Sequence, residues 1–203
     1  MSVNVEYSSK EVSHLVLENV LKMLVRRNNI KTHEKLLNEL TNDFINKSIV
    51  DFKDENNKKV SINMSNLKLA SIIQGSPLDD YLRNNLDVHK ILIIREPSKK
   101  VVKQIMTEYP NSEIFFEFEM MEDIPSKIFI PEHQLLTEEE KTNILETFKE
   151  TELAKINDTD IMSRYYQAKI GDIFRIIRPS MTAGKNIFYR RVVVGKIDQL
   201  FEN

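Results

Sequence analysis

The four histidines of this 203-residue chain stand far apart: His14, His33, His89 and His133. Imidazole binds metals and exchanges protons near neutral pH, so two histidines one helical turn apart would indicate a zinc site. No pair has that spacing, and the chain has no cysteine to complete such a site. Pro131 precedes His133 by two residues, which favours a packed or hydrogen-bonding histidine over a metal ligand. The sequence therefore predicts no metal centre.

Carboxylates could instead hold Mg²⁺ in a nuclease, which needs an acid on one strand and an acid and a lysine two positions apart on the next. Glu117 and Glu119 fall in a predicted strand, but no lysine lies in register with them. Glu139, Glu140 and Lys141 have a suitable spacing but lie at the start of a predicted helix. The sequence therefore argues against a nuclease.

Motifs for nucleophilic catalysis and for phosphate binding are also missing from the sequence. The glycines, Gly75, Gly171, Gly184 and Gly195, are scattered and form no phosphate-cradling loop. No serine occupies the G-x-S-x-G pattern of a nucleophile elbow. We therefore predict no catalytic residue and no cofactor.

Charged residues divide the C-terminal third into an acidic part and a basic part, although the net charge of the chain is only −2. Residues 132–160 carry nine acids against three lysines, whereas residues 164–196 carry one acid, Asp172, against eight bases. These bases are Arg164, Lys169, Arg175, Arg178, Lys185, Arg190, Arg191 and Lys196. Clustered cations release counterions from phosphate and favour nucleic-acid binding, but a docking face for an acidic partner has the same composition. The charges alone leave both interpretations open.

Length and composition indicate a soluble globular protein of one large or two small domains, with 41% hydrophobic and 30% charged residues. The absence of cysteine excludes disulfides and suits a reducing compartment. The first residues lack a basic segment followed by an apolar core, so we expect no secretory signal. No apolar run approaches membrane-spanning length.

The N-terminal part of the chain predicts a mixed α/β domain that starts with two helices. Ser8 or Ser9 can cap a helix to about residue 27, because apolar residues recur there at three- and four-residue steps. A second helix is expected from Thr32. Two short strands, at residues 48–52 and 59–64, follow around a polar turn.

A parallel βαβ unit is predicted after these strands. Ser76 and Pro77 have the form of a helix cap followed by a first-turn proline. Residues 90–95 form a short apolar run typical of a buried central strand. Pro97 is expected to open the next helix, and residues 113–119 to form the next strand. Strand, helix and strand in this order predict a right-handed crossover.

The junction between the two parts is predicted near residues 123–127. Pro125 and Pro131 bracket residues 127–130, which favours an extended linker or an edge strand there. Beyond it, Thr137 and Glu140 form a capping box, so a helix is expected to start at this point.

Residues 170–194 contain two β-rich runs, 172–178 and 186–194, that predict a β-hairpin. Pro179 lacks an N–H and is expected to end the ladder, while Gly184 can adopt a positive φ in the connection. The hydroxyls of Ser180 and Thr182 can bond nearby backbone groups and fix the loop.

Three blocks of the C-terminal third, in the correct order, resemble the fifth shared subunit of eukaryotic nuclear RNA polymerases and its counterpart in archaeal RNA polymerase. The first block is Arg178-Pro179-Ser180-Met181-Thr182-Ala183-Gly184 followed by Tyr189-Arg190, with Met181 where the family usually has Glu. The second is Ile130-Pro131-Glu132-His133-Gln134-Leu135-Leu136-Thr137, and the third is Asp160-Ile161-Met162-Ser163-Arg164-Tyr165-Tyr166, with Ile161 where the family usually has Pro. Three motifs in order are far more specific than one.

The resemblance implies a non-catalytic subunit of a multisubunit DNA-directed RNA polymerase, whose catalysis lies in the large subunits. It implies that residues 1–127 form a jaw domain with a nuclease-like mixed sheet and flanking helices, bordering downstream duplex DNA without reading its sequence. Residues 128–203 would form a small α+β assembly domain with a β-hairpin, docking on the largest subunit near the small sixth subunit. The implied interface residues are those of the matched motifs: Pro131, His133, Arg164, Tyr165, Arg178, Ser180, Thr182, Ala183, Gly184, Tyr189 and Arg190.

The source is either a eukaryotic cell, which implies the nucleus, or a large DNA virus, which implies a virion or a cytoplasmic viral factory. The departures at Met181 and Ile161 favour the virus. The alternative function is a free-standing DNA-binding or regulatory protein that uses the basic part directly.

Overall fold

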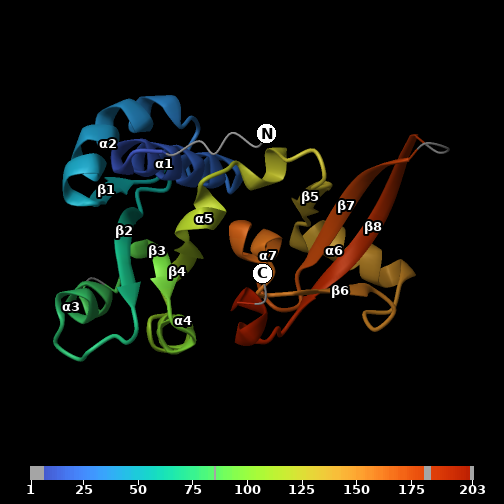
Figure 1. Cartoon of the computed structure of the whole chain (residues 1–203). Coiled ribbons are helices and arrows are strands. Elements are labelled where there is room, and N and C mark those ends of the chain that lie inside the picture. The colour runs from blue at the N-terminus through green and yellow to red at the C-terminus, as the bar shows by residue number, and fades with distance from the viewer. Residues whose placement is uncertain (1–6, 85, 181–183, 202–203) are drawn as a thin grey trace, which may run out of the picture. The chain divides into compact units, whose positions relative to one another are not determined.

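The computed structural model describes residues 7–84, 86–180 and 184–201, without the side chain of Ser180. Contacts divide the chain into two compact units, Met1–Asp123 and Ile124–Asn203. Each unit contains one four-stranded mixed sheet with helices (Figure 1). The predicted combination of mixed sheets and helices is thus confirmed. No helix in the described part of the chain is long and apolar enough to cross a membrane.

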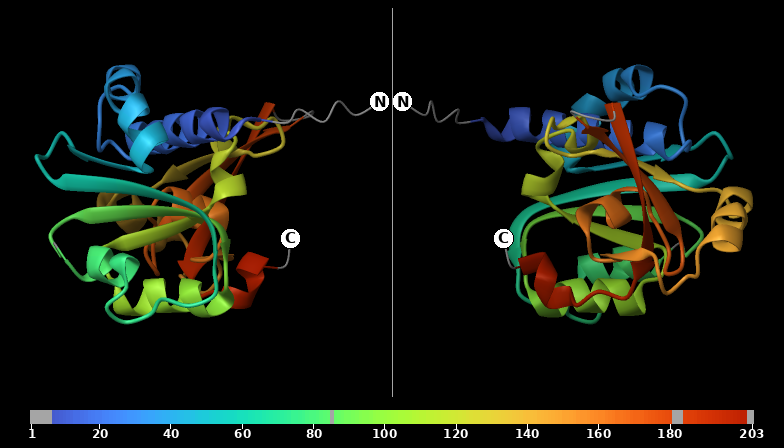
Figure 2. Two further views of the ribbon diagram at one scale, coloured as in Figure 1. Left: turned by 60° about the vertical axis from the view of Figure 1, so that its left-hand side comes forward. Right: turned by 90° about the vertical axis from the view of Figure 1, so that its right-hand side faces the viewer.

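The N-terminal unit has the strand order β1-β2-β3-β4, in which β1 is antiparallel to β2 and the other pairs are parallel. Its elements are α1 (Ser9–Arg26), α2 (Glu34–Lys47), β1 (Ile49–Lys53), β2 (Lys59–Leu69), α3 (Pro77–Arg83), β3 (His89–Pro97), α4 (Lys99–Glu108), β4 (Ser112–Phe116) and α5 (Glu117–Met120). The predicted βαβ unit is therefore present as β3-α4-β4. In Figures 1 and 2, α1 and α2 lie on one face of this sheet, and α3 and α4 on the other.

Serine caps fix where three of these helices begin. The side chains of Ser8, Ser76 and Ser98 each accept a hydrogen bond from a backbone N–H in the first turn of the following helix. The caps at Ser8 and Ser76 were predicted. The expected start at Pro97 was wrong, because Pro97 still pairs with Leu69 in the sheet and Ser98 supplies the cap that proline lacks.

The strand expected at residues 113–119 ends at Phe116, and Glu117 and Glu119 lie in helix α5 instead. The Glu119 carboxylate accepts a hydrogen bond from the Phe116 N–H at 2.8 Å, which stabilises the helix start. Glu117 is buried and pairs with Arg95 at 2.9 Å. The two acids therefore serve the local fold and do not share the face of a strand.

The C-terminal unit has the strand order β5-β7-β8-β6, with only β6 and β8 parallel among the described pairs. Its elements are η1 (Ile124–Ser126), β5 (Glu132–Leu135), α6 (Glu138–Thr147), β6 (Ala154–Asn157), α7 (Ile161–Tyr165), β7 (Ile173–Ser180), β8 (Gly184–Val193) and η2 (Ile197–Phe201). The predicted hairpin is β7-β8, and the predicted capping box of Thr137 and Glu140 opens α6.

Residues 127–130 form a turn and not the expected extended segment. The Ile130 N–H bonds to the Lys127 carbonyl at 2.9 Å, and the Lys127 N–H bonds to the Ile124 carbonyl at 3.2 Å. In the described sheets no strand pairs with this segment, and these two bonds are local.

Candidate interaction surface

The tip of the β7-β8 hairpin carries the first of the three sequence blocks. Arg178 pairs with Asn186, Pro179 with Lys185 and Ser180 with Gly184, which has a φ of +72°. The positive φ at Gly184 was predicted. The ladder was expected to end at Pro179 but extends one pair further, because β5 pairs only as far as Ile177 and leaves one side of β7 without a strand. Met181, Thr182 and Ala183 lie outside the described residues.

A groove of about 410 Å³ lies beside this tip and joins it to the second sequence block. Pro131, Arg178 and Gly184, all predicted interface residues, line it together. The other lining residues are Ile128, Phe129, Ile130, Glu132, Ile177, Pro179 and Lys185. The hairpin thus brings together residues that lie almost 50 positions apart in the sequence.

Large apolar side chains around the groove are open to solvent. Ile128 and Phe129 line the groove, and their side chains are fully exposed and 76% exposed, respectively. Ile187 and Phe188, on opposite faces of the neighbouring strand β8, are 55% and 47% exposed. Exposed apolar side chains gathered at one place indicate a surface that another molecule covers. Ile128 and Phe129 were not predicted as site residues, although an apolar triplet between two prolines is a signal that could have identified them.

Arg178 lies on the same face of the hairpin as Phe188. Its guanidinium carbon is 5.8 Å from the centre of the Phe188 ring, so the cation lies over the aromatic side chain. Both side chains are exposed. This pair offers a partner one positive charge and one apolar contact from one face of the hairpin.

His133 anchors the start of β5 and is not a free acid or base. Its Nδ1 donates to the Pro131 carbonyl at 2.7 Å, and its ring meets the edge of Phe174 at a centroid distance of 5.8 Å. Burial lowers the pKa of His133 although the Pro131 carbonyl and Asp160 favour the charged form, and the Arg190 and Arg178 charges lower it further. His133 therefore holds the groove residue Pro131 against the core.

The third sequence block builds the core of the unit more than its surface. Asp160 caps α7 by accepting from the Met162 N–H at 2.8 Å, and Arg164 Nε donates to the Thr159 carbonyl at 3.2 Å. Tyr165 is only 1% exposed, so no partner can reach its side chain in this fold. Of this block, Arg164 is half-buried and is the predicted site residue nearer the surface.

Tyr189 and Arg190 follow each other on β8 and so point to opposite faces of the sheet. Tyr189 packs against the small core of Leu136, Leu153 and Ile173. Arg190 lies on the other face, where its charge reaches His133. Both side chains are half-buried, and neither lines the groove.

Acidic residues neutralise part of the basic segment. Arg175 pairs with Glu140 at 3.1 Å, and Arg191 pairs with Glu150 at 2.7 Å. Arg178 and Lys185 instead line the groove together with a single acid, Glu132. Arg178 and Lys185 therefore place two exposed positive charges at the hairpin tip.

The described residues contain no group of three or more histidines and acids that could hold a metal ion. Glu117 and Glu119, the acids weighed for a nuclease, have the partners Arg95 and the Phe116 N–H. The geometry at the hairpin is that of a binding surface: concave, apolar and rimmed by cations.

Comparisons with known proteins match the region of the groove and, in two relatives, most of the chain. The family model "RNA polymerase Rpb5, C-terminal domain" matches residues 122–192. The chain is 29% identical over 195 residues to DNA-directed RNA polymerase subunit 5 of Acanthamoeba polyphaga mimivirus, covering 92% of this chain and 94% of the relative. It is 28% identical over 148 residues to subunit rpabc1 of DNA-directed RNA polymerases I, II and III of Dictyostelium discoideum, covering 70% and 75%.

An archaeal relative corresponds to only part of the chain. DNA-directed RNA polymerase subunit Rpo5 of Thermofilum pendens is 39% identical over 75 residues, which are 36% of this chain but 94% of the relative. Almost the whole archaeal protein therefore corresponds to about a third of this one.

Proposed function

The chain belongs to the RNA polymerase Rpb5 family, and on that premise we propose that it is a non-catalytic polymerase subunit that docks on the largest subunit through its C-terminal unit. The groove beside the hairpin tip is the observation that carries this proposal. It combines exposed apolar side chains with Arg178 and Lys185, and Pro131, Arg178 and Gly184 in it come from the family's motifs.

Residues 128–203 act as the assembly domain in this proposal, with the largest subunit and the small sixth subunit as partners. Pro131, Arg178 and Gly184 contact the partner directly, and their sequence neighbours Ser180, Thr182 and Ala183 extend the same contact. The other motif residues contribute indirectly, by holding the hairpin and β5 in place: His133, Arg164, Tyr165, Tyr189 and Arg190. This division follows from burial: Tyr165 is enclosed, whereas Arg178 is exposed.

Residues 1–127 form the jaw beside downstream duplex DNA in this proposal. Phosphate contacts orient DNA without reading its sequence, so no base-specific site is needed. Phosphodiester chemistry belongs to the large subunits, and this chain contributes geometry. The compartment is then that of the polymerase: the nucleus of a cell, or the virion or cytoplasmic factory of a virus.

A free-standing DNA-binding protein is less well supported. Two of the eight bases counted for that interpretation, Arg175 and Arg191, are paired with acids of the same unit. The exposed Phe129 and Ile187 also fit an apolar protein surface better than the phosphate backbone of duplex DNA.

Affinity capture of the tagged full-length protein from its native source tests the docking. We expect stoichiometric recovery of the two largest polymerase subunits, identified by mass. Arg178→Glu should reduce their recovery, because it reverses a charge at the groove and removes the cation over Phe188.

Lys155→Glu is the matched control, since Lys155 is exposed and lies on β6 at the base of the hairpin, opposite Arg191. It makes the same change of charge without touching the groove. Equal recovery with Arg178→Glu and Lys155→Glu would contradict the proposed surface. Recovery of the chain alone, or with DNA but no polymerase, would contradict the function.

A further inference from the structure

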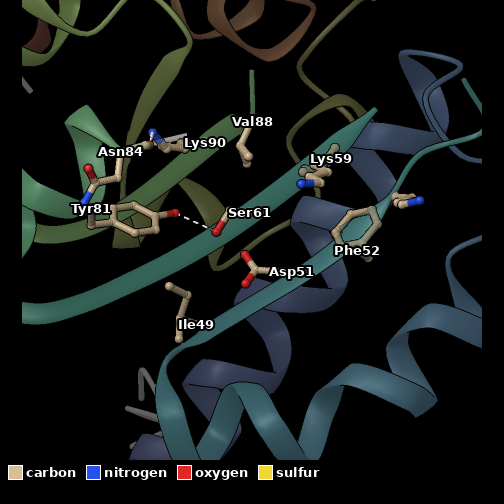
Figure 3. A pocket seen from close by; sticks show the side chains of 11 residues that line it. Ile49, Asp51, Phe52, Lys59, Ser61, Tyr81, Asn84, Val88 and Lys90 are labelled. Atoms are coloured by element: carbon tan, nitrogen blue, oxygen red, sulfur yellow. Dashed lines mark hydrogen bonds between the residues drawn. The ribbon is translucent and has the colours of Figure 1, made fainter. Parts of the chain in front are cut away.

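A second hollow lies in the N-terminal unit, where β1 and the first residues of β2 and β3 face the end of α3 (Figure 3). Its volume of about 590 Å³ is within the range of ligand and side-chain pockets. Asp51 on β1, Ser61 on β2 and Lys90 on β3 are register partners, so their side chains lie in one row across the sheet face that forms its floor.

Two members of this site are fixed by internal hydrogen bonds. Lys90 is 2% exposed, and its ammonium donates to the carbonyls of Leu82 and Asn84 at 2.8 and 2.5 Å. The Tyr81 hydroxyl donates to Ser61 Oγ at 2.7 Å, and burial raises the pKa of Tyr81 to about 12. The Tyr81 hydroxyl therefore stays protonated at neutral pH, and its oxygen keeps a lone pair that can accept a hydrogen bond.

Asp51 differs from these residues because its carboxylate is exposed and, in the described part of the chain, has no hydrogen-bond or ion-pair partner. Figure 3 shows it pointing into the hollow, close to the Tyr81–Ser61 pair and above Ile49. A carboxylate beside a phenol oxygen accepts from several donors at once, which matches the fork of an arginine side chain.

The outer edge of β1 borders the hollow and pairs with no strand among the described residues. Ile49, Asp51 and Lys53 are alternate residues of β1, so they face the same side, and all three line the hollow. An edge with free backbone groups next to a side-chain pocket is the arrangement that recognises an extended peptide by strand addition.

We propose that β1 binds an extended segment of a partner protein as an added antiparallel strand. The partner places an arginine opposite Asp51, an acidic residue opposite Lys53 and an apolar residue opposite Ile49. Read along the partner, the alternate residues are acid, arginine and apolar. This site is independent of the hairpin groove and goes beyond the proposed docking.

Two synthetic peptides of identical composition test the proposal by titration into the ¹⁵N-labelled full-length protein. The first contains Asp-Thr-Arg-Thr-Ile, and the second exchanges its charged residues to read Arg-Thr-Asp-Thr-Ile. We expect the first to shift the amide signals of residues 49–53 and to bind about tenfold more tightly, because the exchange turns two attractive cross-strand pairs into repulsive ones.

The double variant Asp51→Lys with Lys53→Glu should reverse that preference, and both positions are exposed enough to be changed without loss of the fold. N-methyl groups can be placed on alternate residues of the first peptide in two patterns. The pattern that blocks the N–H groups facing β1 should abolish binding, and the other pattern should keep it. Equal binding of both peptides, no reversal in the double variant, or amide shifts away from β1 would each overturn the proposal. The charges would then serve only to protect an edge strand from aggregation.

Discussion

Replacing Glu113 with glutamine should destabilise the N-terminal unit by about 3 kcal/mol at neutral pH. Glu113 accepts from Arg27 at 2.9 and 2.8 Å and also contacts His89, and the Arg27 side chain is only 4% exposed. Burial alone would raise the pKa of Glu113, but the Arg27 charge and the bonds from His89 and Arg27 lower it from 4.5 to about 2. A difference of about 2.5 pKa units corresponds to about 3 kcal/mol.

The loss of stability caused by Glu113→Gln should depend on pH, and the lowered pKa of Glu113 determines the direction. Because the folded pKa lies below the unfolded one, Glu113 contributes its full stability above about pH 4.5 and loses it as the pH falls toward 2. The gap between the wild type and Glu113→Gln should therefore shrink from about 3 kcal/mol at pH 6 to below about 1 kcal/mol near pH 2.

Urea unfolding with pulsed hydrogen–deuterium exchange, read on peptides from residues 89–116, measures this unit separately from the other. Glu96→Gln is the matched control, since Glu96 lies on β3 in an exposed ion pair with Lys68 at 3.4 Å. It should cost less than about 0.5 kcal/mol. A gap for Glu113→Gln that stays constant from pH 6 to pH 2 would refute the reasoning, since the loss would then not come from the ionised carboxylate.

Three further substitutions in the C-terminal unit test its stability and its proposed docking surface separately. Gly184→Val should destabilise the hairpin by about 1–2 kcal/mol because Gly184 has a φ of +72°, and loss of exchange protection across β7 and β8 would show it. Thr137→Ala should cost about 1 kcal/mol by removing the hydroxyl that accepts from the Glu140 N–H, measured as a lower thermal midpoint; an unchanged midpoint would exclude the capping role. Phe129→Asp should leave the midpoint unchanged because Phe129 is 76% exposed, yet lower the recovery of polymerase subunits in affinity capture; full recovery would remove Phe129 from the docking surface.

Local signals in the sequence located most elements because short-range hydrogen bonds determine them. Ser8, Ser76 and Thr137 each occupy a position from which a hydroxyl reaches the first turn of a helix, and each caps one. The end of β4 was not predictable in this way. Acid and aromatic residues continue past Phe116, but the carboxylate of Glu119 turns back to the Phe116 N–H and starts a helix.

Some residues of the candidate surface could be predicted from the family's motifs, whereas others are revealed only by contacts between distant parts of the chain. The motifs located Arg178, Gly184 and Pro131, which the structure places around one groove. They could not separate surface from core, since Tyr165 belongs to the same kind of motif but is enclosed by the fold. Ile128 and Phe129 carry no motif, and only the turn at residues 127–130 brings them to the groove.

The hairpin tip has the properties of an element completed by a partner. β5 pairs with β7 only as far as Ile177, and β6 pairs with β8 only from Arg190 onward, so among the described residues the outer part of the hairpin is a two-stranded ribbon. Two-stranded ribbons are marginally stable in water without a further apolar layer. Ile187 and Phe188 are successive residues of β8, so they lie exposed on opposite faces of the ribbon, and neither face has a core of its own there. Docking on a large subunit would bury both faces and supply the layer that the isolated unit lacks.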